Sequence, residues 1–233
     1  MISHAYKALI ANKLKTFLII ISLIFSIVSI FLISSISNGV IYMYSSMLKS
    51  DGDIIITQAK ISDTFFSNVD INLIKEIEYL KNINEAGAMI VGASPVEKLP
   101  IVAIYGVTQN RFKNYKLEKG KYPLYNEVIV GESIFKQLEN KNEVQITNKT
   151  FKISGVFESE IGFENGGIVL NISDAGEIFN KSASMILVNT ALNSDIEEII
   201  KEIKTLSKDI DVKSTQNFLD NYNQWDRSEF CVN

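Results

Sequence analysis

FLIIISLIFSIVSIFLISSI, residues 17–36, is the stretch that decides how this chain is organised. It holds 15 large apolar residues and five serines, and no Asp, Glu, Lys or Arg lies between Lys15 and Lys49. A helix of this length rises about 30 Å, the thickness of the hydrocarbon core of a bilayer. The Leu, Ile, Phe and Val side chains favour insertion and no charge opposes them. We therefore predict one transmembrane helix over residues 17–37.

The flanking charges predict the orientation of this helix. Lys7, Lys13 and Lys15 precede it, and the first acidic residue is Asp51. Positive residues stay on the cytoplasmic side, so residues 1–16 are expected inside and the residues after Asn38 outside. Residues 1–16 suit either an amphipathic segment on the inner membrane surface or an unstructured basic flank.

A cleaved signal peptide is the main alternative to an anchor. The apolar region of a signal peptide is usually only about 7–15 residues long and ends at an Ala-x-Ala-like site. The apolar run here is longer, and the segment SSISNGV that follows it lacks that site. An uncleaved membrane anchor is therefore the favoured interpretation.

Three serines share one face of the predicted span. Ser22, Ser26 and Ser29 have the spacing i, i+4, i+7. Small polar residues placed in this way let a second transmembrane helix approach closely and hydrogen-bond to it. Alternatively, each hydroxyl donates to the carbonyl of its own preceding turn while facing lipid. The sequence leaves both readings open.

The remainder of the chain has the composition of an ordered, acidic domain. A helical extension is expected over residues 38–52, although Asn38-Gly39 is also a possible helix break. Without the three N-terminal lysines, the chain carries 20 basic and 27 acidic residues, a net charge of −7. This charge argues against nucleic acid as a partner.

The pattern of apolar residues predicts an α+β domain. One helix is expected to begin at Asp70, and another at a capping box formed by Ser194 and Glu197. The apolar runs predict strands over 53–57, 88–93, 101–107, 184–189 and 210–213. Residues 53–107 and 182–218 thus predict a split βαβ subdomain with two helices on one face of a mixed sheet.

A β-rich insert, residues 108–181, interrupts this subdomain. Short helices are expected over 132–138 and 173–179, and Asn148-Lys149-Thr150 reads as a hairpin turn. Strands are predicted over 127–131, 144–147, 151–156 and 168–171.

Counting the reactive residues excludes most catalytic sites. His4 is the only histidine and lies before the span, and Cys231 is the only cysteine. The outer part therefore has no Ser-His-Asp or Cys-His arrangement, and the chain cannot build a zinc site. Glu158, Glu160 and Glu164 are best read as a solvated acidic loop. The sequence has no phosphate-binding P-loop, and we predict no enzymatic activity, metal or cofactor.

The order of several short segments resembles a known family. The segments are NKLKT (12–16), GDIIIT (52–57), IYGV (104–107), LEKGKYP (117–123), EVIVG (127–131) and FKISGVF (151–157). In this order and spacing they resemble the membrane subunits of MacB/FtsX-type ABC transporters, which include the lipoprotein-releasing permeases. Their external domain is known as the MacB-like periplasmic core.

The resemblance implies a transport function. Such permeases form dimers, recruit a separate cytoplasmic ATPase and pass ATP-driven movement outward by mechanotransmission. They export or extract substrates, or act on periplasmic partners. Their "porter" part corresponds to residues 53–107 and 182–218, and their "sabre" part to residues 108–181. This implies the cytoplasmic (inner) membrane as the location, with the main domain periplasmic or extracellular and either a homodimer or a heterodimer with another permease.

The chain also departs from the family pattern. Family members have four spans, whereas this sequence has one long apolar run. Residues 219–233 stand where the lead-in to a second span is expected, so the chain is expected to be a fragment, a truncated product or half of a split permease. The second hypothesis is a stand-alone, single-span anchored module that binds or senses a periplasmic partner.

Overall fold

The computed structural model describes residues 11–49, 52–61, 63–159 and 162–218. The chain divides into two compact units, Met1–Tyr44 and Ser45–Asn233. The predictions for residues 1–10, including Lys7, and for the lead-in at 219–233 lie outside the described residues.

The first unit is formed by most of a single long helix, α2 (Lys13–Lys49). Its segment Lys13–Val40 has a mean hydropathy of 2.9, and it is long and apolar enough to cross a membrane. None of its most apolar part is buried inside the structure. The helix continues through Asn38 and Gly39 to Lys49, so this pair does not break it.

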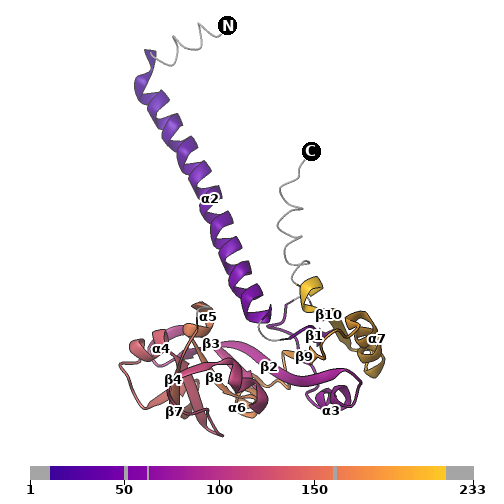
Figure 1. Cartoon of the computed structure of the whole chain (residues 1–233). Helices are drawn as coiled ribbons and strands as arrows, with labels where there is room; N and C mark the ends of the chain where they lie inside the picture. Colours follow the sequence, from indigo (N-terminus) through magenta and orange to yellow (C-terminus); the bar gives the residue numbers. More distant parts are fainter. Residues whose placement is uncertain (1–10, 50–51, 62, 160–161, 219–233) are drawn as a thin grey trace. The chain divides into compact units, whose positions relative to one another are not determined.

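The second unit contains a ten-stranded mixed sheet (Figure 1). Along the main path the strand order is β10-β1-β9-β2-β3-β8-β5-β7-β4, and β6 pairs with β2 and β7. The strands are β1 (Ile54–Gln58), β2 (Ile83–Val96), β3 (Leu99–Val107), β4 (Lys116–Gly120), β5 (Glu127–Gly131), β6 (Glu143–Ile146), β7 (Lys149–Glu158), β8 (Gly167–Asn171), β9 (Met185–Thr190) and β10 (Ile210–Ser214).

Short helices connect these strands. They are α3 (Leu73–Glu78), the 3-10 helix η1 (Gln109–Asn114), α4 (Glu132–Gln137), α5 (Gly162–Asn165), α6 (Ile172–Phe179) and α7 (Ile196–Leu206).

The split βαβ arrangement is confirmed. Strand β9 lies between β1 and β2 and is antiparallel to both, so β1 and β2 are parallel strands joined through α3. In the same way, β1 lies between β9 and β10, which are joined through α7. Residues of α3 and α7 share one core cluster with alternate residues of these strands, among them Ile54, Ile56, Leu73, Ile77, Ile186, Val188, Ile199, Ile200, Ile203 and Val212. The two helices therefore cover the same face of the sheet, as predicted.

The other half of the sheet closes on itself into a ring of six strands, which we call the closed half. The pairs β2–β3, β3–β8, β8–β5, β5–β7 and β7–β6 return to β2 through Val96 and Ile146. All six strands contribute apolar side chains to a second core cluster, including Ile90, Val102, Ile104, Val128, Val130, Val144, Phe151, Ile168 and Leu170. The predicted β-rich insert is thus completed by β2 and β3. The division into a porter-like and a sabre-like subdomain stays a prediction, since residues 45–233 form one compact unit.

Two of the predicted helices, α3 and α7, begin at other residues than the sequence indicated. The N-cap of α7 is Asp195, whose side chain accepts from the N–H groups of Glu197 and Glu198. Ser194 instead donates its hydroxyl to the carbonyl of Ala191, so the predicted capping box is wrong. Asp70 accepts from the N–H of Asn72, and α3 begins after Asn72 rather than at Asp70.

The β6–β7 hairpin is tighter than the sequence indicated. Ile146 pairs with Lys149, which leaves Thr147 and Asn148 as the loop in place of residues 148–150. Thr147 has a φ of 54°, the left-handed conformation that a two-residue hairpin loop requires of at least one residue. Neither β4 nor η1 was predicted from the sequence.

Candidate functional site

Helix α6 connects the closed half of the sheet back to β9. It follows β8 and packs across β3 and β2. Close approach is possible because β2 has a glycine at its contact with Phe179. A Cβ at Gly92 would lie 2.3 Å from the Phe179 ring. Ile172, the first residue of α6, packs against both core clusters, so the helix contacts both halves of the domain.

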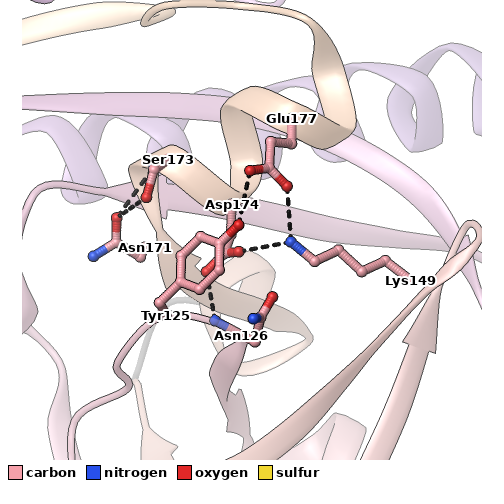
Figure 2. A network of polar contacts seen from close by, with 7 residues as sticks. All are labelled: Tyr125, Asn126, Lys149, Asn171, Ser173, Asp174 and Glu177. Carbon is pink, nitrogen blue, oxygen red and sulfur yellow. Dashed lines mark hydrogen bonds and ion pairs between the residues drawn. The ribbon is translucent and has the colours of Figure 1, made fainter.

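The start of α6 is set by its N-cap residue. The side-chain oxygen of Asn171 accepts from the N–H of Ser173 at 3.1 Å and from its hydroxyl at 2.7 Å. Asp174 and Glu177 follow with the spacing i, i+3, which places them on one face of the helix. Figure 2 shows both carboxylates directed toward Lys149.

Asp174 is a fully buried carboxylate. Its Oδ1 lies 2.9 Å from Nζ of Lys149, the first residue of β7. Its Oδ2 accepts from the backbone N–H of Asn126 at 2.9 Å, in the turn before β5. One side chain of α6 thus joins two segments of the closed half, and these bonds offset the cost of burying the carboxylate.

Glu177 completes the group at the surface. Its Oε2 lies 2.8 Å from Nζ of Lys149, and its Oε1 accepts from the hydroxyl of Tyr125 at 2.9 Å (Figure 2). The same ammonium lies 4.9 Å from the ring centroid of Tyr125 and 5.2 Å from that of Phe151, within the range of cation–π attraction. We call Tyr125, Asn126, Lys149, Asp174 and Glu177 the Lys149 network.

The pKa values within this network follow from these contacts. Burial opposes the charged form of Lys149, but the hydrogen bonds to Glu177 and Asp174 outweigh it and raise the pKa of Lys149. The hydrogen bonds from Lys149 and then Tyr125 lower the pKa of Glu177. The bond to Glu177 raises the pKa of Tyr125. Lys149 and Glu177 are therefore charged and Tyr125 is neutral at physiological pH.

This arrangement suits attachment rather than chemistry. Both oxygens of Asp174 are engaged within the protein, and the ammonium of Lys149 is shared by two carboxylates. No group of three or more His, Cys, Asp or Glu side chains suited to a metal ion occurs within the described ranges. The Lys149 network fastens α6 to β7 and to the turn before β5.

The Lys149 network was not predicted from the sequence. Lys149 and Asp174 are 25 positions apart, and each had only a local role, Lys149 in a turn and Asp174 at a helix start. Charge complementarity alone was no guide, because the chain has many lysines and acidic residues. Lys149 and Asp174 can be paired only once α6 is known to pack across the strands.

Of the serines predicted to form a helix–helix packing face on α2, Ser22 and Ser26 are exposed and Ser29 is half-buried. The hydroxyls of Ser22, Ser26 and Ser29 donate to the carbonyls of Ile19, Ser22 and Phe25 at 2.9, 2.9 and 2.8 Å. These are the local bonds of the alternative reading. A hydroxyl bonded in this way still has lone pairs to offer a neighbouring helix, so the packing face stays a prediction. Lys13 and Lys15 of the predicted positive-inside anchor are exposed.

Two acidic residues near the end of β7 lie within the part of the chain that the structure describes. Glu164 accepts from the hydroxyl of Ser159 at 2.7 Å, and Glu158 is exposed at the end of β7. Glu160 lies outside the described residues.

An aromatic loop between β1 and α3 was also missed. Phe66 is 72% exposed, and Phe65 and Ile61 are 38% and 37% exposed. The loop is held in place: Lys181 donates to the carbonyl of Phe65, and Asn68 accepts from the N–H of Ser182 at 2.9 Å. Exposed apolar groups on a fixed backbone are typical of contact surfaces.

Comparison with known proteins identifies the family to which this domain belongs. The family model of the MacB-like periplasmic core domain matches residues 16–206, more than half of the chain. A search of curated proteins finds no match.

Two solved structures share the fold. The periplasmic region of MacB from Actinobacillus actinomycetemcomitans aligns with a TM-score of 0.58 at 15% identity, covering 80% of this chain and 97% of that one. The extracellular domain of the noncanonic ABC-type transporter YknZ from Gram-positive bacteria aligns with a TM-score of 0.57 at 11% identity, covering 69% of this chain and 98% of that one. The chain therefore belongs to the family of the MacB-like periplasmic core domain, an external part of ABC-type transporter permeases.

Proposed function

We propose that this chain is the N-terminal portion of an ABC transporter permease of the MacB/FtsX type. Its domain would couple ATP hydrolysis by a separate cytoplasmic ATPase to export or extraction of a substrate outside the membrane. The chain itself would be non-enzymatic and need no cofactor. In this proposal α2 anchors it in the cytoplasmic (inner) membrane, with the N-terminus cytoplasmic and the sheet domain periplasmic or extracellular.

The observation that carries this proposal is the continuity of α2. The helix runs without a break across the boundary between the two compact units at Tyr44 and Ser45. Only four residues separate its last residue, Lys49, from the first residue of β1. A helix is a stiff element, so displacement of a membrane span would pass into the sheet without a long flexible linker.

Two features of the sheet domain support its proposed part in mechanotransmission. One sheet joins all ten strands, and the Lys149 network fastens α6, which packs on β2 and β3, to β7 and the turn before β5. We propose that residues 53–107 with 182–218 act as the porter part and residues 108–181 as the sabre part. Ser22, Ser26 and Ser29 would contact a span of a second copy or of another permease.

An ATP-dependent movement of the sheet domain tests this function. The chain, tagged and purified with its partners from native membranes, would carry an environment-sensitive dye at Lys116→Cys in a Cys231→Ser background. We expect ATP hydrolysis in the preparation and a change in dye fluorescence on adding Mg-ATP, which vanadate abolishes. Hydrolysis without any change in fluorescence, or the absence of an associated ATPase, would contradict the proposal.

The aromatic loop favours one other function, a single-span anchored module that binds a soluble protein outside the membrane. Ile61, Phe65 and Phe66 are too few to hold a stable dimer, which needs about 800 Å² from each partner, but they suit a transient contact. A photo-crosslinking residue at Phe66 in intact cells separates the two functions. A crosslinked external protein in a preparation without an ATPase would support the binding module.

A further inference from the structure

The two strands through which the chain enters and leaves the sheet are joined at one end. Strand β1 pairs with β10 in antiparallel register, with Ile54 opposite Ser214. The next residue outward continues this ladder: the N–H of Thr215 donates to the carbonyl of Asp53 at 2.8 Å. The hydroxyl of Thr215, which is 5% exposed, donates to the carbonyl of Gly52 at 2.5 Å. Two hydrogen bonds thus join the chain just before β1 to the chain just after β10.

Asp53 extends this connection to the strand on the other side of β1. Its N–H donates to the carbonyl of Val188 in β9 at 2.9 Å. Its Oδ2 accepts from the N–H and the hydroxyl of Thr190, the last residue of β9, at 2.8 and 3.0 Å. Gly52 lies close to β9 as well, because a Cβ there would be 3.1 Å from the carbonyl oxygen of Val188. Three neighbouring strands are therefore bonded to one another at this end.

The direction of these bonds matters for force. The first residue of β1 and the last residue of β10 lie at the same end of an antiparallel pair. A force that separates the preceding chain from the following chain would open such a pair one hydrogen bond at a time, starting from that end. The bonds of Gly52, Asp53 and Thr215 are the first that such a force would load.

We propose that Gly52, Asp53, Thr190 and Thr215 form a mechanical clamp. The clamp keeps β10, β1 and β9 moving as one body when the chain before β1 is displaced relative to the chain after β10. Its biological role rests on the proposed function, in which such displacements come from the membrane side. The clamp itself is a property of the sheet and is tested without any ATPase.

Optical-tweezers measurements on the full chain in nanodiscs test the clamp. Handles at Lys49→Cys and Asn217→Cys, in a Cys231→Ser background, pull at the end that carries the clamp. We expect Thr215→Val to open the β1–β10 pair about fivefold faster at a fixed force, the effect of one net hydrogen bond on a barrier. The matched control is Thr57→Val, the same change at a buried residue toward the other end of β1, which should leave the opening rate unchanged.

Pulling from the opposite end distinguishes a clamp at one end of the strand pair from a general effect of the substitution on the stability of the domain. Handles at Lys60→Cys and Lys208→Cys load first the bond from the N–H of Ala59 to the carbonyl of Asp209. In this geometry Thr215→Val should not change the opening rate. An equal effect from both ends, or no effect from either, would overturn the clamp.

Asp53 gives a second, independent variant if Thr215→Val does not fold. Asp53→Ala removes the acceptor of Thr190 and should speed opening only from the clamp end, whereas Asp53→Asn keeps an acceptor oxygen and should restore the slow rate. Equal rates for Asp53→Ala and Asp53→Asn would also overturn the clamp. A failed ATP-dependent movement with a normal pulling result would refute the proposed function and leave the clamp in place.

Discussion

Gly106 of β3 lies directly against Ala175 of α6. A Cβ built on Gly106 would be 2.1 Å from the Cβ of Ala175, far closer than two carbon atoms can approach. Ala175 is fully buried and belongs to the core cluster of the closed half. The backbone of β3 and the small side chain of α6 therefore set the distance at which the helix packs on the sheet.

Gly106→Ala should destabilise the domain. Overpacking of this kind usually costs about 1–3 kcal/mol, since the helix must shift away from the strand. Urea unfolding of the full chain in nanodiscs, followed by circular dichroism, measures the loss. Gly39→Ala is the matched control, because a Cβ at Gly39 meets nothing within 4 Å. Equal stability of the two variants would show that α6 does not pack on β3 at this distance.

Lys149→Met should be among the most damaging single changes in the network. It leaves the fully buried carboxylate of Asp174 without its counter-charge, and breaking a buried ion pair from one side typically costs about 3–5 kcal/mol. Glu177→Gln, at an exposed ion pair with the same lysine, should cost clearly less, because solvent screens an exposed pair. The two variants are compared by denaturant unfolding, and a similar loss in both would contradict a buried role for Asp174.

Stability should fall in acid partly because of Glu177. Its pKa is lowered by the hydrogen bond from Lys149, so folding favours its charged form. This contribution is present above the ordinary pKa of 4.5 and is lost as the pH falls through the lowered value. The melting temperature of Glu177→Gln should therefore decline less between about pH 5 and the acid end of the titration than that of the unmodified chain. Parallel declines would contradict this contribution.

The N-cap of α7 is testable residue by residue. Asp195→Ala removes the acceptor of two backbone N–H groups and should cost about 1 kcal/mol. Ser194→Ala removes only a bond to the carbonyl of Ala191, so it should cost clearly less. Amide hydrogen exchange at Glu197 and Glu198 should accelerate in the first variant alone. The reverse order would restore the capping box expected from the sequence.

Ile27→Arg together with Val28→Arg should prevent α2 from inserting. Two arginines at the centre of a span cost about 5–7 kcal/mol on the insertion scale. Alkaline extraction of membranes should release this variant while retaining the unmodified chain. Retention of both would contradict a membrane span at residues 17–37.

The regular elements could be read from the sequence because each has a local cause. The Ile54–Ile56 run and the helical spacing of Ile199, Ile200 and Ile203 report burial directly, and these residues lie in the core as expected. The alternation that places Ile54 and Ile56 on the helix-covered face is likewise a local property of a strand.

The contacts that organise the domain were not visible in this way. The pairing of Val96 with Ile146 and the bond of Lys149 with Asp174 join segments 50 and 25 positions apart, and no local pattern links them. The aromatic loop is a local feature, but it was missed because the exposed Phe65 and Phe66 fit neither helical nor strand periodicity. The capping box failed because Ser194 and Asp195 both suit an N-cap, and sequence could not choose between neighbours.

Strand β2 has a consequence for any attempt to divide this protein. Its first half pairs with β9 and its second half with β3, while its last residue meets β6. Residues 108–181 expressed in isolation would lack β2 and β3, two of the six strands that enclose their apolar core. Such an excised piece should aggregate or remain unfolded, so the insertion is not an autonomous module, and grafting experiments must carry β2 and β3 with it.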